Sequence, residues 1–173
     1  MPTNTFEALA TTVVSGTSTN TVTFSGLNTS TYKNFIIIGS CRATGAAAHL
    51  GMFVNGISSY NYYTQQVNCY SLSSAFSAVP VSGINNNNYI NLSQFQMTNN
   101  TSSNVVFRST ITNASAGRTN VLSECYNFMA NNNSSNWTHS NAYINESLSS
   151  ISIQTIGAGF FGNTSTFSIY GLI

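Results

Sequence analysis

The stretch LGMFVNG, residues 50–56, decides the fold class of this chain. Leu50, Met52 and Val54 occupy every second position, and an apolar period of two is the signal of a half-buried β-strand. Asn55-Gly56 follows at once. This dipeptide favours a type I′ turn, because both central residues of that turn need a positive φ. The stretch therefore predicts a β-strand that ends in a tight turn.

The same signal recurs on both sides of this stretch. Val22 and Phe24 alternate with threonines, which predicts another half-buried strand. Residues 35–38 read FIII, an all-apolar run that suits a central strand covered on both faces. Apolar and aromatic runs predict further strands at residues 60–70, 89–97, 105–111, 122–129, 151–153 and 167–170.

Polar blocks separate these predicted strands. The asparagine run at residues 85–88 and the polar block at residues 131–136 are both predicted to form exposed loops. No linker or internal repeat divides the chain. The sequence therefore predicts an all-β fold, a single-domain antiparallel β-sandwich that is jelly-roll-like and has about eight strands. We expect this domain to span residues 11–173, preceded by an N-terminal arm at residues 1–10.

Charge is almost absent from the surface that this fold would present. The chain of 173 residues has 4 Lys or Arg, 3 Asp or Glu and a net charge of +1. Without a cationic stripe, neither nucleic acid nor an anionic membrane surface is an expected partner. The opening MPTNTFEALATTVV lacks a basic region and contains Glu7, so we expect no signal peptide and synthesis in a cytoplasm.

Catalytic and metal-binding constellations are not expected. The histidines, His49 and His139, have no aspartate to orient them, and no Gly-x-Ser-x-Gly motif is present. The glutamates could in principle supply a glycosidase pair, but solvated or hydrogen-bonded carboxylates are the expectation. No cluster has the spacing of metal ligands. The chain is therefore predicted to be non-enzymatic, with no catalytic residues, no metal and no cofactor.

The rare charged residues and the cysteines have other expected roles. The charged groups whose pairing within or between subunits we expect are Arg42, Arg108, Arg118, Glu124 and Glu146. Cys41, Cys69 and Cys125 are odd in number and widely spaced, so buried thiols are expected, with an inter-subunit disulfide as the alternative.

Aromatic residues in polar surroundings are candidate glycan contacts. Tyr60 and Tyr62 lie in an aromatic-polar segment, and Trp137 stands between Asn136 and Thr138. Sugar sites commonly stack rings on such side chains and offer amides to hydroxyl groups. The alternative for Trp137 is packing at the sandwich edge with its N–H group satisfied.

Three blocks of the sequence resemble a group of tailed-phage and prophage virion structural proteins. The first is EALATTVV at residues 7–14, followed by VTF at 22–24 and TYKNF at 31–35 leading to Cys41-Arg42. The second is MFVNG at 52–56 before YNY at 60–62. The third comprises residues 137–142, ISI at 151–153 and FSIYGL at 167–172. The chain departs from the pattern where Thr164-Ser165 replaces Gly-Ser before the last strand.

The resemblance implies a jelly-roll-like protein that assembles on a virion, commonly as a trimer. It supplies no active-site residues, because its motifs are structural. The expected function is a capsid decoration or cement protein, with copies of itself and the major capsid protein as partners. The alternative is a tail-fibre or receptor-binding module that recognises host surface glycans.

Overall fold

The computed structural model describes residues 6–46, 48–58, 62–72, 75–97, 104–114, 118–128, 133–143 and 147–173. Throughout this part of the chain the regular structure is β-strand, without helix. The strands are β1 (Phe6–Val13), β2 (Thr21–Ser25), β3 (Asn34–Cys41), β4 (Ala43–Thr44), β5 (Ala48–Val54), β6 (Tyr62–Leu72), β7 (Ala75–Asn87), β8 (Ile90–Met97), β9 (Asn104–Ala114), β10 (Arg118–Phe128), β11 (Asn133–Tyr143), β12 (Ser150–Gly157), β13 (Phe160–Phe161) and β14 (Thr166–Leu172).

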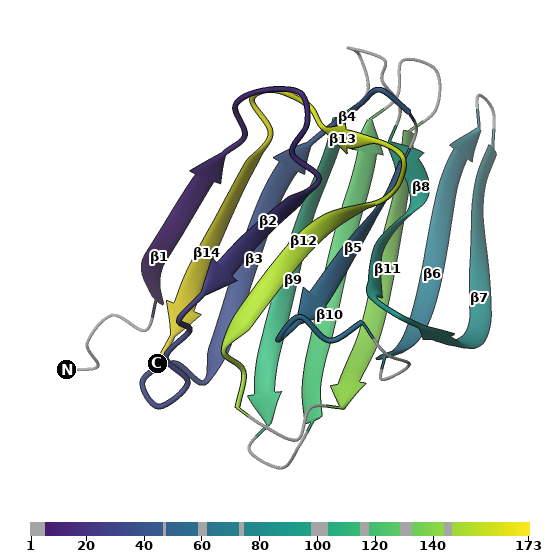
Figure 1. Ribbon diagram of the computed structural model, residues 1–173. Coiled ribbons are helices and arrows are strands. Elements are labelled where there is room, and N and C mark those ends of the chain that lie inside the picture. Colours follow the sequence, from purple (N-terminus) through teal and green to yellow (C-terminus); the bar gives the residue numbers. More distant parts are fainter. Residues whose placement is uncertain are drawn as a thin grey trace.

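Two antiparallel sheets form a β-sandwich, which confirms the predicted fold class. The large sheet has the order β1-β14-β3-β9-β10-β11-β6-β7, and the small sheet has the order β2-β12-β5-β8. Figure 1 shows the small sheet lying across the large one, with β6 and β7 at the far edge. A short ladder joins β13 to β4.

The strand order follows a jelly roll. The chain passes from β2 to β3 and from β5 to β6, each time crossing from the small sheet to the large one, and β12 returns beside β2. The β10–β11 hairpin is inserted between β9 and β6, while β14 and β1 extend the large sheet beyond β3. These additions explain why the two sheets, with eight and four strands in the described part of the chain, together exceed the expected eight or so.

Alternation along the strands builds the core between the sheets. Phe35 and Ile37 of β3 and Phe107 of β9 point inward and are buried. They join Met52 and Ile153 of the small sheet in one apolar cluster. The predicted alternation of residues 50–54 is confirmed, and so is the turn after it, because φ is 52° at Asn55 and 68° at Gly56.

Three local predictions were wrong. Asparagines 85–87 complete β7, and residues 133–136 lie within β11, paired to β10. Neighbouring strands supply ladder hydrogen bonds there, which override the weak strand preference of Asn and Ser. The expected N-terminal arm is part of the large sheet from Phe6 onward, since β1 pairs with β14. Residues 1–5 lie outside the described residues.

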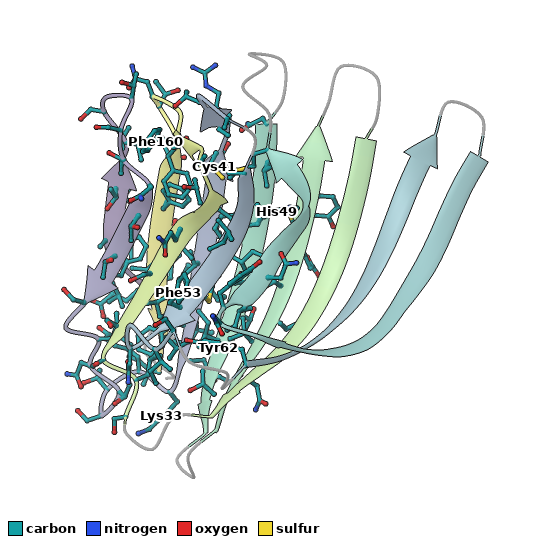
Figure 2. All side chains as sticks on the ribbon, turned by 45° about the vertical axis from the view of Figure 1, so that its right-hand side comes forward. Lys33, Cys41, His49, Phe53, Tyr62 and Phe160 are labelled. Carbon is teal, nitrogen blue, oxygen red and sulfur yellow. The ribbon has the colours of Figure 1, made fainter. Side chains whose placement is uncertain are left out.

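The prediction that the apolar run of β3 is covered on both faces holds in part, because Phe35, Ile36 and Ile37 are buried. The inward residues of β3 meet the small sheet, but Ile38 on the opposite face is 42% exposed. No described element lies over that face, as the two views show (Figures 1 and 2). Ile38 is therefore the residue of this apolar run that the described part of the chain leaves exposed.

Candidate functional site

The face of the large sheet that points away from the small sheet is called the outer face. Register places on it alternate residues of five strands, β1, β14, β3, β9 and β10. Its central positions are Ile36 and Ile38 of β3, Val106, Arg108 and Thr110 of β9, and Leu122, Glu124 and Tyr126 of β10.

Exposed apolar side chains gather on this outer face. Six large apolar residues are exposed in the described part of the chain, and all except Ile173 lie on it: Phe6, Val13, Ile38, Leu122 and Tyr126. Leu122 is 54% exposed. Single exposed apolar residues are ordinary on a protein surface, whereas apolar residues that form a contiguous patch mark an interaction site. The outer face has the character of a contact surface.

Arg108 and Glu124 supply the charge at the centre of the outer face. They stand directly opposite each other on β9 and β10, and with Thr110 and Leu122 they line a shallow hollow of about 150 Å³. In the part of the chain that the structure describes, no ion pair holds either group. Their predicted pairing between subunits stays a prediction.

The remaining charged candidates are scattered. Arg42 lies at the end of β3, away from the centre of the outer face. Arg118 begins β10 opposite Tyr143, but its side chain lies outside the described part. Glu146 lies outside the described residues altogether. The structure thus brings together only Arg108 and Glu124 of the five.

The structure places only one of the three candidate glycan contacts, Tyr62, with its side chain described. Tyr62 is fully buried, and its hydroxyl donates to the carbonyl of Ile57 at 2.7 Å and accepts from the N–H of Val54 at 2.9 Å. Its ring is therefore not a platform for a sugar, which corrects the expectation for this residue. Tyr60 lies outside the described residues. Trp137 pairs in register with Glu124, within a strand and not in a loop, and its side chain lies outside the described part.

Nucleophilic or metal chemistry finds little support among the described side chains. Burial raises the pKa of the Cys41 thiol, with a smaller contribution from Cys125, so the reactive thiolate is disfavoured. Cys41 and Cys125 are both buried, as expected, and Cys69 lies outside the described side chains. Within the described ranges, no three His, Cys, Asp or Glu residues are placed to hold a metal ion. The same ranges contain no helix that is long and apolar enough to cross a membrane.

Sequence reasoning missed the outer face as a site, although a signal was present. The all-apolar run of β3 was predicted to be buried on both faces, and Ile38 of this run is exposed in the single chain. An exposed isoleucine in an otherwise buried apolar run is the signal that points to a partner.

Comparison with known proteins assigns this chain to no family. No family model, no curated protein and no solved structure matches the chain.

Proposed function

We propose that this chain is a non-enzymatic virion structural protein, a capsid decoration or cement protein that assembles as a trimer on a phage head. Synthesis takes place in the host cytoplasm, and the working location is the virion. Its partners are copies of itself and the major capsid protein. No cofactor takes part.

The observation that carries this proposal is the exposed apolar outer face of the large sheet. Ile38 and Leu122 lie in adjacent register rows on it, and both are exposed. A broad sheet face with exposed apolar side chains suits a flat and extended partner better than a small molecule, because small ligands are bound in concave pockets. An assembled shell is such a partner, and the three sequence blocks that resemble virion proteins support this choice.

A cement protein stabilises a shell by binding the assembled form and not the free subunits. The chain can make such contacts with apolar side chains and neutral hydrogen bonds, since Asn, Ser and Thr together make up 73 of its residues. No chemical step is needed.

The test measures binding of outer-face variants to shells assembled from the major capsid protein. The double variant Ile38→Gln, Leu122→Gln should fold normally, because both residues are exposed. It should bind shells at least tenfold more weakly, a loss of about 1.4 kcal/mol. The matched control is Ile173→Gln, which removes an exposed apolar residue away from the outer face and should bind like the parent. Unchanged binding by the double variant would refute the proposal.

The tail-fibre or receptor-binding module is separated from this proposal by copy number. A decoration protein is present in hundreds of copies per particle, whereas a tail tip holds a handful. Quantitative mass spectrometry of purified particles, with the major capsid protein as the internal reference, decides between them. The burial of Tyr62 removes one of the three residues on which the glycan-binding alternative depended.

A further inference from the structure

A polar pocket lies at one end of the sandwich, apart from the centre of the outer face. It encloses about 230 Å³ between the end of β3, the start of β9 and the turn before β14, and its lining is Ser40, Cys41, Arg42, Asn104, Asn163, Thr164 and Ser165. Figure 2 shows Cys41 and Phe160 near this end and Lys33 near the opposite end. The lining carries hydroxyl, amide and guanidinium groups and, the buried Cys41 apart, no apolar side chain. We call it the Arg42 pocket.

The wall of the Arg42 pocket is fixed by hydrogen bonds before any ligand arrives. The N–H of Ser165 donates to the carbonyl of Gly162 at 3.0 Å and closes a β-turn. The N–H of Thr164 donates to the carbonyl of Val14 at 3.0 Å, and the N–H of Gly162 donates to the carbonyl of Arg42 at 2.8 Å. The turn is therefore held on both sides.

Arg42 is held against this turn and has no carboxylate partner in the described part of the chain. A Cβ atom at Gly162 would stand 2.6 Å from Cγ of Arg42 and 2.8 Å from its Nε, so the arginine lies flat on the glycine. Glu7 accepts a hydrogen bond from Tyr32, and Glu124 stands opposite Arg108. A guanidinium among neutral polar groups favours an anionic partner that it can contact with two N–H groups.

The turn carries backbone strain at the residue that lines the pocket. Thr164 has a φ of 72°, which is the region that Gly or Asn normally takes at the third position of a type II turn. A β-branched residue there is an outlier. Strain of this kind is concentrated at binding and catalytic sites, where the surrounding structure holds it in place. Here it coincides with a polar pocket and an arginine.

We propose that the Arg42 pocket binds a carboxylate-bearing saccharide unit, with the guanidinium of Arg42 on the carboxylate. Asn163, the hydroxyl group of Thr164 and the amide oxygen of Asn104, whose Nδ2 donates to Oγ of Ser40, meet the hydroxyl groups of the sugar. The volume is smaller than the roughly 300–1,000 Å³ of sites that bury a drug-sized ligand, so one sugar unit at the end of a glycan is the fitting size. The inference concerns a separate surface and holds for a head or a tail location.

The test is a ligand-observed NMR titration of the full chain with D-glucuronate, D-glucose and acetate. D-Glucuronate should bind about tenfold or more tightly than D-glucose, which lacks the carboxylate, and than acetate, which lacks the hydroxyl groups. Equal affinity for D-glucuronate and D-glucose, or no binding of D-glucuronate at millimolar concentration, would overturn the proposal. Equal affinity for acetate and D-glucuronate would reduce the pocket to an adventitious anion site and overturn it too.

Two variants locate the site on the molecule. Arg42→Gln should abolish the preference for D-glucuronate over D-glucose, and Asn163→Ala should weaken D-glucuronate several-fold while keeping that preference. The control is Lys33→Gln, which removes a positive charge at the other end of the sandwich and should leave binding unchanged. If Arg42→Gln does not fold, the Asn163→Ala result decides, since Asn163 is exposed in a turn; parental affinity in that variant would place the ligand elsewhere.

Discussion

At the residue scale, Thr164 is the clearest case of a side chain in a backbone conformation that does not suit it. Its φ of 72° stores strain of about 1–3 kcal/mol, and glycine would relieve it at an entropic cost of about 0.5–1 kcal/mol. We expect Thr164→Gly to raise the free energy of unfolding by about 1 kcal/mol. Thermal unfolding should show this as a rise of about 2–4 °C in Tm.

A matched control for this change lies two residues along. Thr166 is in β14 with ordinary strand geometry, so Thr166→Gly should lower stability by about 0.5–1 kcal/mol. The two Thr→Gly substitutions would then change the free energy of unfolding in opposite directions. A lower Tm for both would show that Thr164 is not strained.

The hydroxyl of Tyr62 provides a second prediction at this scale. It accepts from the N–H of Val54 and donates to the carbonyl of Ile57 in a buried setting. Tyr62→Phe would leave that buried N–H group without its acceptor, which costs about 1–3 kcal/mol. Urea unfolding should report the loss. Tyr126→Phe, at an exposed position, is the control and should change stability by less than about 0.5 kcal/mol.

The pH dependence of stability follows from the same buried groups. Burial raises the pKa of Tyr62, against a smaller lowering by its hydrogen bond with Val54, and burial also raises the pKa of Cys41. A raised pKa in the folded state means that the folded chain holds its protons to a higher pH than the unfolded chain. Stability should therefore be unaffected by these groups below their unfolded pKa values, about 8.5 for Cys and 10 for Tyr, and should fall as the pH rises beyond them. Tyr62→Phe should make the decline above pH ~10 shallower; an unchanged slope would contradict this origin.

At the element scale, β1 is the strand that the core holds least. None of its residues is buried. Its side-chain contacts with β14 lie at the surface: the rings of Phe6 and Tyr170 stack with their centroids 4.7 Å apart, and the hydroxyl groups of Thr11 and Ser168 are 2.8 Å apart. Regions with few buried apolar contacts open at a lower free energy than the core. We expect the amides of β1 to exchange hydrogen well before those of β3, which hydrogen exchange with mass spectrometry measures. Equal protection of β1 and β3 would contradict it.

Sequence pattern predicted the elements best where one face is clearly apolar. The strands at residues 22–24, 50–54 and 105–111 alternate as expected, because burial of one face fixes both the register and the side that each residue takes. The pattern failed in the Asn-rich ends of β7 and β11, where pairing with neighbouring strands decides the conformation and composition does not.

The candidate site was less accessible to sequence reasoning than the elements were. Arg108 and Glu124 were chosen because charged residues are rare in this chain, and although they are 16 positions apart in sequence they stand directly opposite each other on β9 and β10. The Arg42 pocket combines the ends of two strands with a strained turn, which a linear pattern does not bring together. Nothing in the linear pattern shows that Thr164 takes a backbone conformation that suits glycine.

At the scale of the whole molecule, two surfaces of opposite character emerge from one nearly neutral chain. The outer face is broad and carries exposed apolar side chains around the opposite charges of Arg108 and Glu124, and the Arg42 pocket is small, polar and cationic. With only 4 Lys or Arg in 173 residues, each surface depends on a different kind of force. The outer face uses burial of apolar area, and the pocket uses a charged hydrogen bond.

These two forces respond differently to salt, which gives the last prediction. Salt shortens the distance over which charges act, the Debye length, from about 10 Å at 0.1 M to about 3 Å at 1 M. It does not weaken contacts between apolar side chains. Binding to assembled shells should therefore persist from 0.1 M to 1 M NaCl, whereas D-glucuronate should bind the Arg42 pocket several-fold more weakly at 1 M. Sedimentation of decorated shells and NMR titration over the same NaCl series measure the two responses. Release from shells in moderate NaCl would mean that charge, and not the apolar outer face, holds the protein in place.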